Sequence, residues 1–226
     1  MEGHLGIFDI LGPVMVGPSS SHTAGAVRIG AFARKLLGAQ PASAVIQLHG
    51  SFAATGEGHG TPLALLAGLL GLAPDDERIP AAEDLAAQQG LAYRFEPVDL
   101  GEVHPNTVRL RLEAGGSTLE LCASSVGGGR IRVWNIDGFD VDLDGQYPTI
   151  LLSSPDRPGA VAIVSAILAN ASLNIATIKA HRNSRGGQAL MTVQLDAEPP
   201  ANVLDSLRCL PQFEQVRFIP SLGFGG

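Results

Sequence analysis

The sequence predicts an α+β protein built from two domains. In the C-terminal third, strand-like and helix-like patterns alternate in the order βαββαβ, and in the first two thirds helical patterns come early and strand patterns late. A polar seam, Asp144-Gly145-Gln146, separates the two patterns. We therefore expect an N-terminal α+β domain with a mixed or antiparallel sheet at residues 1–144, and a C-terminal ferredoxin-like domain at residues 147–226.

The N-terminal domain begins with an amphipathic helix at residues 24–37, because Ile29, Phe32 and Leu36 recur at helical spacing. Ser20 or Ser21 would cap it. The elements that follow are a strand at 44–49, a glycine-rich bend, an apolar helix from residue 62, an amphipathic helix at 81–89, and strands at 91–98, 107–113, 118–123 and 130–136. Alternation continues from 130 as far as 144, and Gly115-Gly116 is typical of a hairpin turn.

The C-terminal domain is expected to follow its βαββαβ order closely. Pro158 suits the first position of its first helix. The expected elements are a strand at 147–153, a turn at 156–159, a helix at 160–168, a loop at 170–174, strands at 175–181 and 188–196 joined by a turn at 184–187, a helix at 200–209 and a strand at 213–219.

Composition excludes several classes of protein. The chain has 226 residues, 45% of them hydrophobic, and a net charge of −7, and it has no basic stripe, so we expect no nucleic-acid partner. No apolar run is long enough to cross a membrane, and no signal peptide is evident. Cys122 and Cys209 suggest neither a disulfide framework nor a metal site, and we expect both to be buried thiols in a reduced, cytoplasmic protein.

The run GPSSSHT, Gly17 to Thr23, leads directly into the first helix. The first backbone N–H groups of a helix lack partners and its dipole favours anions, so this position suits a carboxylate. One serine is enough for a helix cap. Three serines with His22 and Thr23 exceed that need and indicate a binding site.

Three further polar clusters follow: HGSFAATGEGHGT at 49–61, HPNT at 104–107 and SSVGGG at 124–129. Four of the six histidines lie in the first three of the four clusters. Each cluster alone has a structural explanation: His49 as a satisfied histidine, His104 as part of a turn, the glycines as a flexible hairpin. No G-x-G-x-x-G fingerprint is present, and a metal site made by the histidines lacks the i, i+4 spacing of a helical pair.

Together these motifs resemble the beta chain of bacterial iron–sulfur-dependent L-serine dehydratase. GPSSSHTAGA, GHGT, HPNT, SSVGGG and a tail that starts SPDRPG carry the resemblance over nearly the whole chain. The tail resembles an ACT domain, and the N-terminal part is similar to a regulatory domain of some phosphoglycerate dehydrogenases. Glu57 and Pro62 stand where that family commonly has lysine and aspartate, so these two positions are poor candidates for chemistry.

The resemblance implies a lyase that eliminates water from L-serine, giving pyruvate and ammonia, in amino-acid metabolism and gluconeogenesis. It implies a partner alpha chain whose cysteines hold a 4Fe–4S cluster, the Lewis acid for the leaving hydroxyl, with no metal on this chain. Two distant cysteines agree with that division. A homodimer or a heterotetramer is expected.

The α-proton needs a base, for which His59 and then His22 are the candidates, unless the alpha chain supplies it. The expected substrate-binding residues are Ser20, Ser21, Thr23, His49, Gly50, Thr61, His104, Asn106, Ser125, Gly127 and Gly128. The expected effector-binding residues, in the ACT-like part, are Asp156, Pro158, Gly159, Asn174 and Ile175.

Two other hypotheses remain at this point. In the first, the chain is a non-catalytic module that binds serine or another amino acid and regulates an enzyme. In the second, it is an oligomerisation domain. Regulation is compatible with catalysis, because an effector can act through a separate site.

Overall fold

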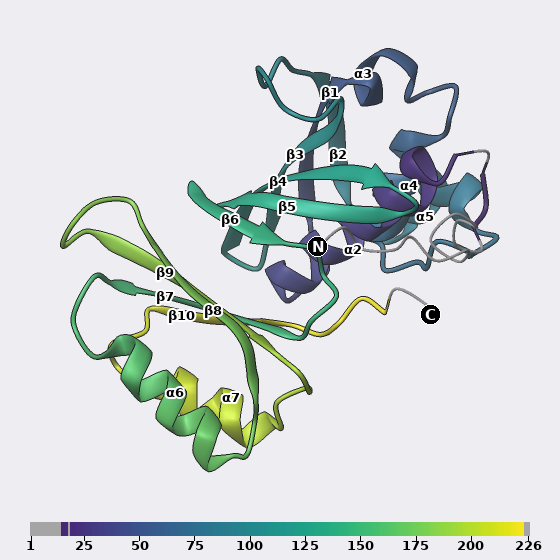
Figure 1. Cartoon of the computed structure of the whole chain (residues 1–226). Coiled ribbons are helices and arrows are strands. Elements are labelled where there is room, and N and C mark those ends of the chain that lie inside the picture. Colours follow the sequence, from purple (N-terminus) through teal and green to yellow (C-terminus); the bar gives the residue numbers. More distant parts are fainter. Residues whose placement is uncertain (1–14, 18, 224–226) are drawn as a thin grey trace, which may run out of the picture. The chain divides into compact units, whose positions relative to one another are not determined.

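The computed structural model describes residues 15–17 and 19–223, so Pro18 of the GPSSSHT run lies outside the described residues (Figure 1). The chain divides into two compact units. One contains the residues up to Asp137 together with Asp142–Asp144, and the other contains Gly138–Val141 and Gly145–Gly223. Each unit has its own sheet and its own helices, and the α+β class is confirmed.

The first unit contains several helices. A π-helical turn at Ser21–Gly25 runs into α2, Ala26–Leu37, whose apolar side chains are buried. The others are α3, Ser51–Thr55; α4, Thr61–Leu69; a 3₁₀ turn at Ile79–Ala81; and α5, Ala82–Gln88. The predicted helices at 24–37, from 62 and at 81–89 are therefore confirmed, with shifted ends.

Helices α2 and α4 approach each other at two glycines. A Cβ atom added to Gly68 would lie 2.1 Å from the carbonyl oxygen of Val27, and one added to Gly30 would lie 2.5 Å from that of Leu65. Only residues without a side chain allow backbones to pack this closely. The contact therefore fixes the position of the two helices relative to each other.

The first five strands of a six-stranded sheet, ordered β2-β1-β3-β4-β5-β6, belong to the first unit, and β6 is divided between the two units. β1 pairs in parallel with β2 and antiparallel with β3, and β3–β4 and β4–β5 are antiparallel. Its strands are β1, Ser43–Gly50; β2, Ala92–Pro97; β3, Asn106–Ala114; β4, Ser117–Gly127; β5, Arg130–Ile136; and β6, Phe139–Leu143. This is the expected mixed sheet.

Strand register brings three of the polar clusters to one end of this sheet. His49 lies opposite Thr107, and Thr107 lies opposite Ser124. The end of β1, the start of β3 and the end of β4 therefore meet, although they are far apart in the sequence.

The second unit contains a four-stranded sheet in the order β10-β7-β9-β8, whose neighbouring strands are antiparallel. Both helices lie on one face of it (Figure 1). Its elements are β7, Thr149–Pro155; α6, Ala160–Asn170; β8, Ile175–Arg182; β9, Gln188–Leu195; α7, Ala201–Arg208; and β10, Gln215–Ile219. Ile150, Val164, Val193 and Leu207 belong to its core. The element order is the predicted βαββαβ.

Several local expectations are wrong. The bend after β1 contains the short helix α3, and β4 continues past its expected end at 123 to Gly127. The alternating segment 130–144 is two strands, since Asp137 and Gly138 both have positive φ angles, 50° and 84°, and make a hairpin turn. Cys209 is exposed, whereas Cys122 is buried as expected.

No helix in the described ranges is long and apolar enough to span a membrane.

We predict that Gly68→Ala lowers the free energy of unfolding by about 1–3 kcal/mol, because its Cβ atom has no room against the backbone of α2. Urea denaturation measures the change. Gly58→Ala is the matched control, since its Cβ atom would meet nothing closer than 3.7 Å. Equal unfolding midpoints for the two variants would show that the helix contact is not tight.

Candidate active site

His22 is held in the π-helical turn by Ser19. The Ser19 hydroxyl accepts the backbone N–H of His22 at 3.3 Å, and Nδ1 of the same histidine lies 3.3 Å from that hydroxyl. Ser20 occupies the N-cap position without a side-chain cap. Ser19 therefore makes the capping-type bond that was expected of Ser20 or Ser21.

The other side of the His22 ring faces helix α3. Nε2 lies 3.3 Å from Ser51 Oγ and 3.5 Å from Thr55 Oγ1. The Phe52 ring packs edge-on against the imidazole, with centroids 5.3 Å apart. Hydroxyls near both ring nitrogens and an aromatic neighbour fix the orientation of this imidazole.

The imidazole of His59 lies beside that of His22, with ring centroids 4.9 Å apart and planes inclined by 48°. His59 is exposed and belongs to the turn between α3 and α4. Its backbone N–H donates to Gly56 O at 3.2 Å, and Gly60 adopts the left-handed conformation that starts α4. The structure therefore brings together the two histidines predicted to be catalytic.

The pKa of His22 lies below its ordinary value of 6.5. Burial is the largest cause, because it disfavours the charged ring. The neighbouring His59 lowers the pKa further, and hydrogen bonding to Ser51 opposes both effects. His22 is therefore mainly neutral near pH 7 and able to accept a proton.

Strand β4 supports the turn that carries His22. A Cβ atom at Gly25 would lie 2.1 Å from Ser125 Oγ, so the strand packs directly on the π-helical turn. Arg28, only 8% exposed, donates from Nη1 to the carbonyl oxygen of Gly129 at 2.7 Å. The Thr107 hydroxyl donates to the carbonyl oxygen of His104 at 2.5 Å, and it also lies 2.7 Å from Ser124 Oγ.

Three hydroxyls of the motifs are buried without a hydrogen-bond partner: those of Thr23, Thr61 and Ser125. All three residues were predicted to bind substrate. Buried polar atoms are normally paired, and exceptions gather where function requires them.

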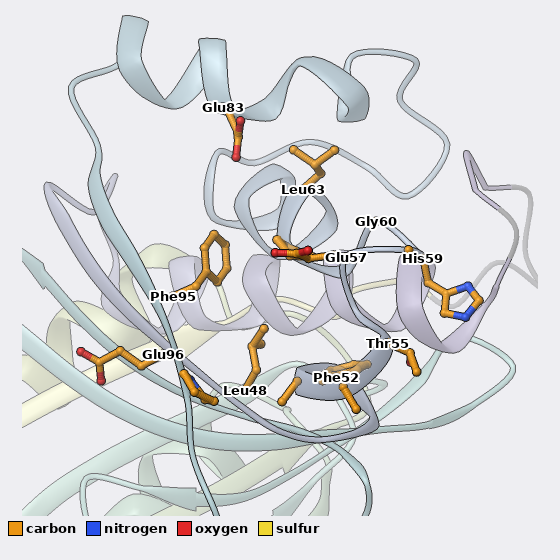
Figure 2. A pocket seen from close by; sticks show the side chains of 15 residues that line it. Leu48, Phe52, Thr55, Glu57, His59, Gly60, Leu63, Glu83, Phe95 and Glu96 are labelled. Carbon is orange, nitrogen blue, oxygen red and sulfur yellow. The ribbon is translucent and has the colours of Figure 1, made fainter.

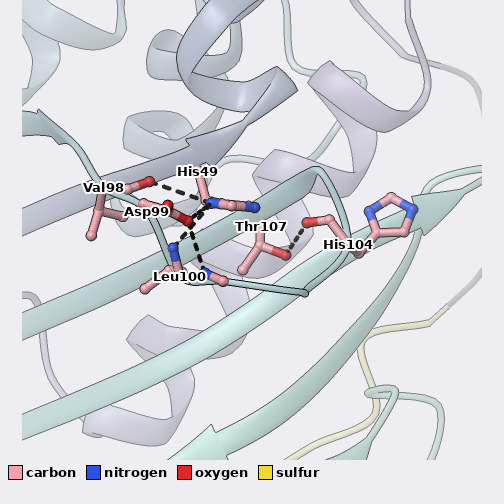
Figure 3. A network of polar contacts seen from close by, with 7 residues as sticks. His49, Val98, Asp99, Leu100, His104 and Thr107 are labelled. Carbon is pink, nitrogen blue, oxygen red and sulfur yellow. Dashed lines mark hydrogen bonds and ion pairs between the residues drawn. The ribbon is translucent and has the colours of Figure 1, made fainter.

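His49, at the end of β1, and His104, in the turn before β3, were both predicted to bind substrate, and both are bonded to nearby backbone groups; Figure 3 shows the contacts of His49 with the segment 98–100. Nδ1 of His49 accepts the N–H of Leu100 at 3.1 Å and lies 3.9 Å from an oxygen of Asp99. Nδ1 of His104, which is exposed, accepts the N–H of Asn106 at 3.1 Å. Both imidazoles therefore order loops at the end of the sheet.

The remaining residues predicted to bind substrate lie at turns of the backbone. Gly50 turns the chain from β1 into α3, and its Cα packs on Pro105, where a Cβ atom would lie 2.7 Å from the carbonyl oxygen. Gly127 and Gly128 have positive φ angles where β4 turns toward β5. Ser21 lies in the π-helical turn itself.

The predicted effector residues form two groups in the second unit. Asp156 accepts the N–H of Gly186 at 3.0 Å and lies 3.3 Å from Arg182, and the bond to Gly186 is the larger cause that holds its pKa below the ordinary range. Asn174 donates to Asp196. Pro158 and Gly159 precede α6 and Ile175 follows it, so about 16 Å of helix separates the two groups within this unit.

The cysteines of this chain do not fit the ligand set of a 4Fe–4S cluster. Such a cluster needs several thiolates close together, whereas Cys122 and Cys209 belong to different units. Burial raises the pKa of the Cys122 thiol to about 11. Within the described residues, no three histidine, cysteine or carboxylate side chains are grouped to hold a metal ion.

Sequence reasoning missed several residues around His22. Ser51, Phe52 and Thr55 lie in α3, a helix of five residues that is too short to show an apolar period in the sequence. Arg28 did leave a signal, because a charged residue stands between the apolar Val27 and Ile29 of an amphipathic helix.

Fold and site together define a class of α+β protein in which two neighbouring imidazoles, one of them contacted by three hydroxyls, lie where helix and strand ends meet. This arrangement suits proton transfer on a small polar molecule.

Comparison with known proteins gives the family. The profile of the serine dehydratase beta chain family matches residues 6–91. The probable L-serine dehydratase beta chain of Bacillus subtilis is 42% identical over 210 residues, covering 93% of this chain and 96% of that protein. The L-serine dehydratase beta chain of Peptoniphilus asaccharolyticus is 37% identical over 214 residues, covering 94% and 96%. The chain belongs to the serine dehydratase beta chain family.

A more distant similarity connects the chain to another enzyme. The D-3-phosphoglycerate dehydrogenase of Bacillus subtilis is 24% identical over 141 residues, covering 61% of this chain and 26% of that protein.

We predict that His22 titrates below pH 6.5 and that His59→Asn raises its pKa without restoring it fully, because burial remains. Because the folded pKa lies below the unfolded one, His22 makes the protein less stable as pH falls through 6.5. NMR titration of ring-labelled histidine measures the pKa. A value of 6.5 or above in the unchanged protein would contradict the site geometry.

Proposed function

We propose that this chain is the beta subunit of an L-serine dehydratase, a lyase that converts L-serine to pyruvate and ammonia by β-elimination of water. The names of its relatives support the reaction, and the match extends over almost the whole length of both chains. One observation carries the assignment of the chemistry: His22 and His59, from separate motifs, lie 4.9 Å apart between ring centroids.

The two imidazoles have different roles in this proposal. His59 is exposed and is placed to take the α-proton of serine. His22 is half-buried and oriented by Ser19 and Ser51, so it serves as the neutral neighbour that stabilises or receives the proton. Imidazoles suit this work because their ordinary pKa is close to neutral pH.

The substrate carboxylate is proposed to bind at the π-helical turn. Ser20, Ser21 and Thr23 lie at the positive end of α2, where an anion is favoured. The unpaired hydroxyls of Thr61 and Ser125 complete the polar wall. Because His49 accepts the N–H of Leu100 and His104 accepts that of Asn106, we assign both residues to shaping this end of the sheet.

A beta chain implies an alpha chain, and the two are proposed to complete one active site. The 4Fe–4S cluster implied by the family resemblance would belong to the alpha chain, because the cysteines of this chain do not fit it. The second unit is proposed to be an ACT-like regulatory domain, and the complex to be a heterotetramer or to contain a dimer of this chain. The separated effector residues would then meet only between domains of two chains.

We predict that His59→Ala lowers turnover of L-serine by about 10²-fold or more, as the loss of an acid–base group commonly does. The measurement is pyruvate release by the alpha–beta complex under anaerobic conditions. His104→Ala is the matched control, and we expect it to change turnover less than threefold, because its imidazole accepts only a turn N–H. Unchanged turnover in His59→Ala would remove this residue from the chemistry.

A further inference from the structure

A cavity of about 920 Å³ lies beside the edge strand β2 in the first unit. Its walls are partly apolar and partly polar, and the apolar part includes Leu48, Phe52, Leu63 and Phe95 (Figure 2). Such a volume is large enough to accept side chains of another molecule. An exposed apolar surface beside a sheet edge is typical of an interaction site.

Two carboxylates point into this cavity from different elements. Glu57 reaches toward Phe95 from the turn before α4, and Glu83 reaches in from α5 (Figure 2). Glu96 also lines the cavity but forms an ion pair with Arg94 at 2.6 Å. We call this hollow, with Glu57 and Glu83, the acidic cavity.

Among the residues that the structure describes, no lysine or arginine lines the acidic cavity. Eight acidic residues and two arginines lie between Thr55 and Leu100. Both arginines are paired, Arg78 with Asp76 at 2.7 Å and Arg94 with Glu96. Glu57 and Glu83 therefore give the cavity a negative charge that a cationic occupant would complement.

The acidic cavity adjoins the candidate active site. His59 lines the cavity, and its ring packs beside that of His22. Phe52 likewise lines the cavity and packs edge-on against His22. A molecule seated in the cavity would therefore reach the edge of the site where the α-proton is proposed to be removed.

We propose that the acidic cavity is the docking surface for the alpha chain, and that the docked segment carries an apolar side chain flanked by lysine or arginine. This rests on the proposed function, in which the alpha chain completes the site at His59. The apolar side chain fills the hollow, and the basic side chains pair with Glu57 and Glu83. A second copy of this chain fits poorly, because its net charge is −7.

The test is a charge reversal, Glu57→Lys with Glu83→Lys, in the reconstituted alpha–beta complex. We expect the dissociation constant for the alpha chain to rise at least about tenfold, because like charges would then face each other. Turnover at saturating alpha chain is expected to stay within about threefold, since neither carboxylate takes part in the chemistry. Glu57→Gln with Glu83→Gln should give an intermediate loss of affinity, and this loss should shrink at high salt.

The control is Glu102→Lys with Glu198→Lys, which makes the same change in net charge at two exposed positions outside the cavity. Its affinity should match that of the unchanged chain. Equal affinities for the control and the charge reversal, both folded by circular dichroism, would overturn the docking proposal while leaving the lyase assignment intact. A wild-type complex that assembles but releases no pyruvate would instead refute the proposed function.

Discussion

The close packing of α2 on α4 at Gly30 and Gly68 is the contact on which the site depends. The number of residues from His22 to Gly30 is similar to the number from His59 to Gly68. The helices touch backbone to backbone at these glycines, and the two imidazoles lie side by side before the helix starts. Larger side chains at the crossing would separate the helices and the histidines with them.

The sheet supplies the second half of the arrangement. Its register brings the ends of β1 and β4 and the start of β3 together, and β4 presses Ser125 onto Gly25 in the π-helical turn. A π-helical turn is rare and often marks a functional site. Here it coincides with hydroxyls that are buried without partners, a cost that a binding site explains better than folding does.

Sequence patterns predicted the α+β class and the βαββαβ order, because apolar periodicity and turn residues are local signals. The polar motifs singled out His22 and His59, which lie side by side in the structure. The contacts of His22 with Ser51 and Thr55 were not predictable, since they depend on how two helices pack. The parallel pairing of β1 with β2 is equally non-local. Asp137-Gly138 did carry a local hairpin signal, which the alternation on both sides of it obscured. The roles of the site residues remain predictions.

The central claim is that His22 and His59 act as one unit in proton transfer. A double-mutant cycle on turnover of L-serine by the alpha–beta complex tests it most directly, using His22→Asn, His59→Asn and the double variant. Residues that act together are not additive, so the double variant should be about as slow as the slower single variant. Losses that multiply would show that the two imidazoles act independently and would contradict the account.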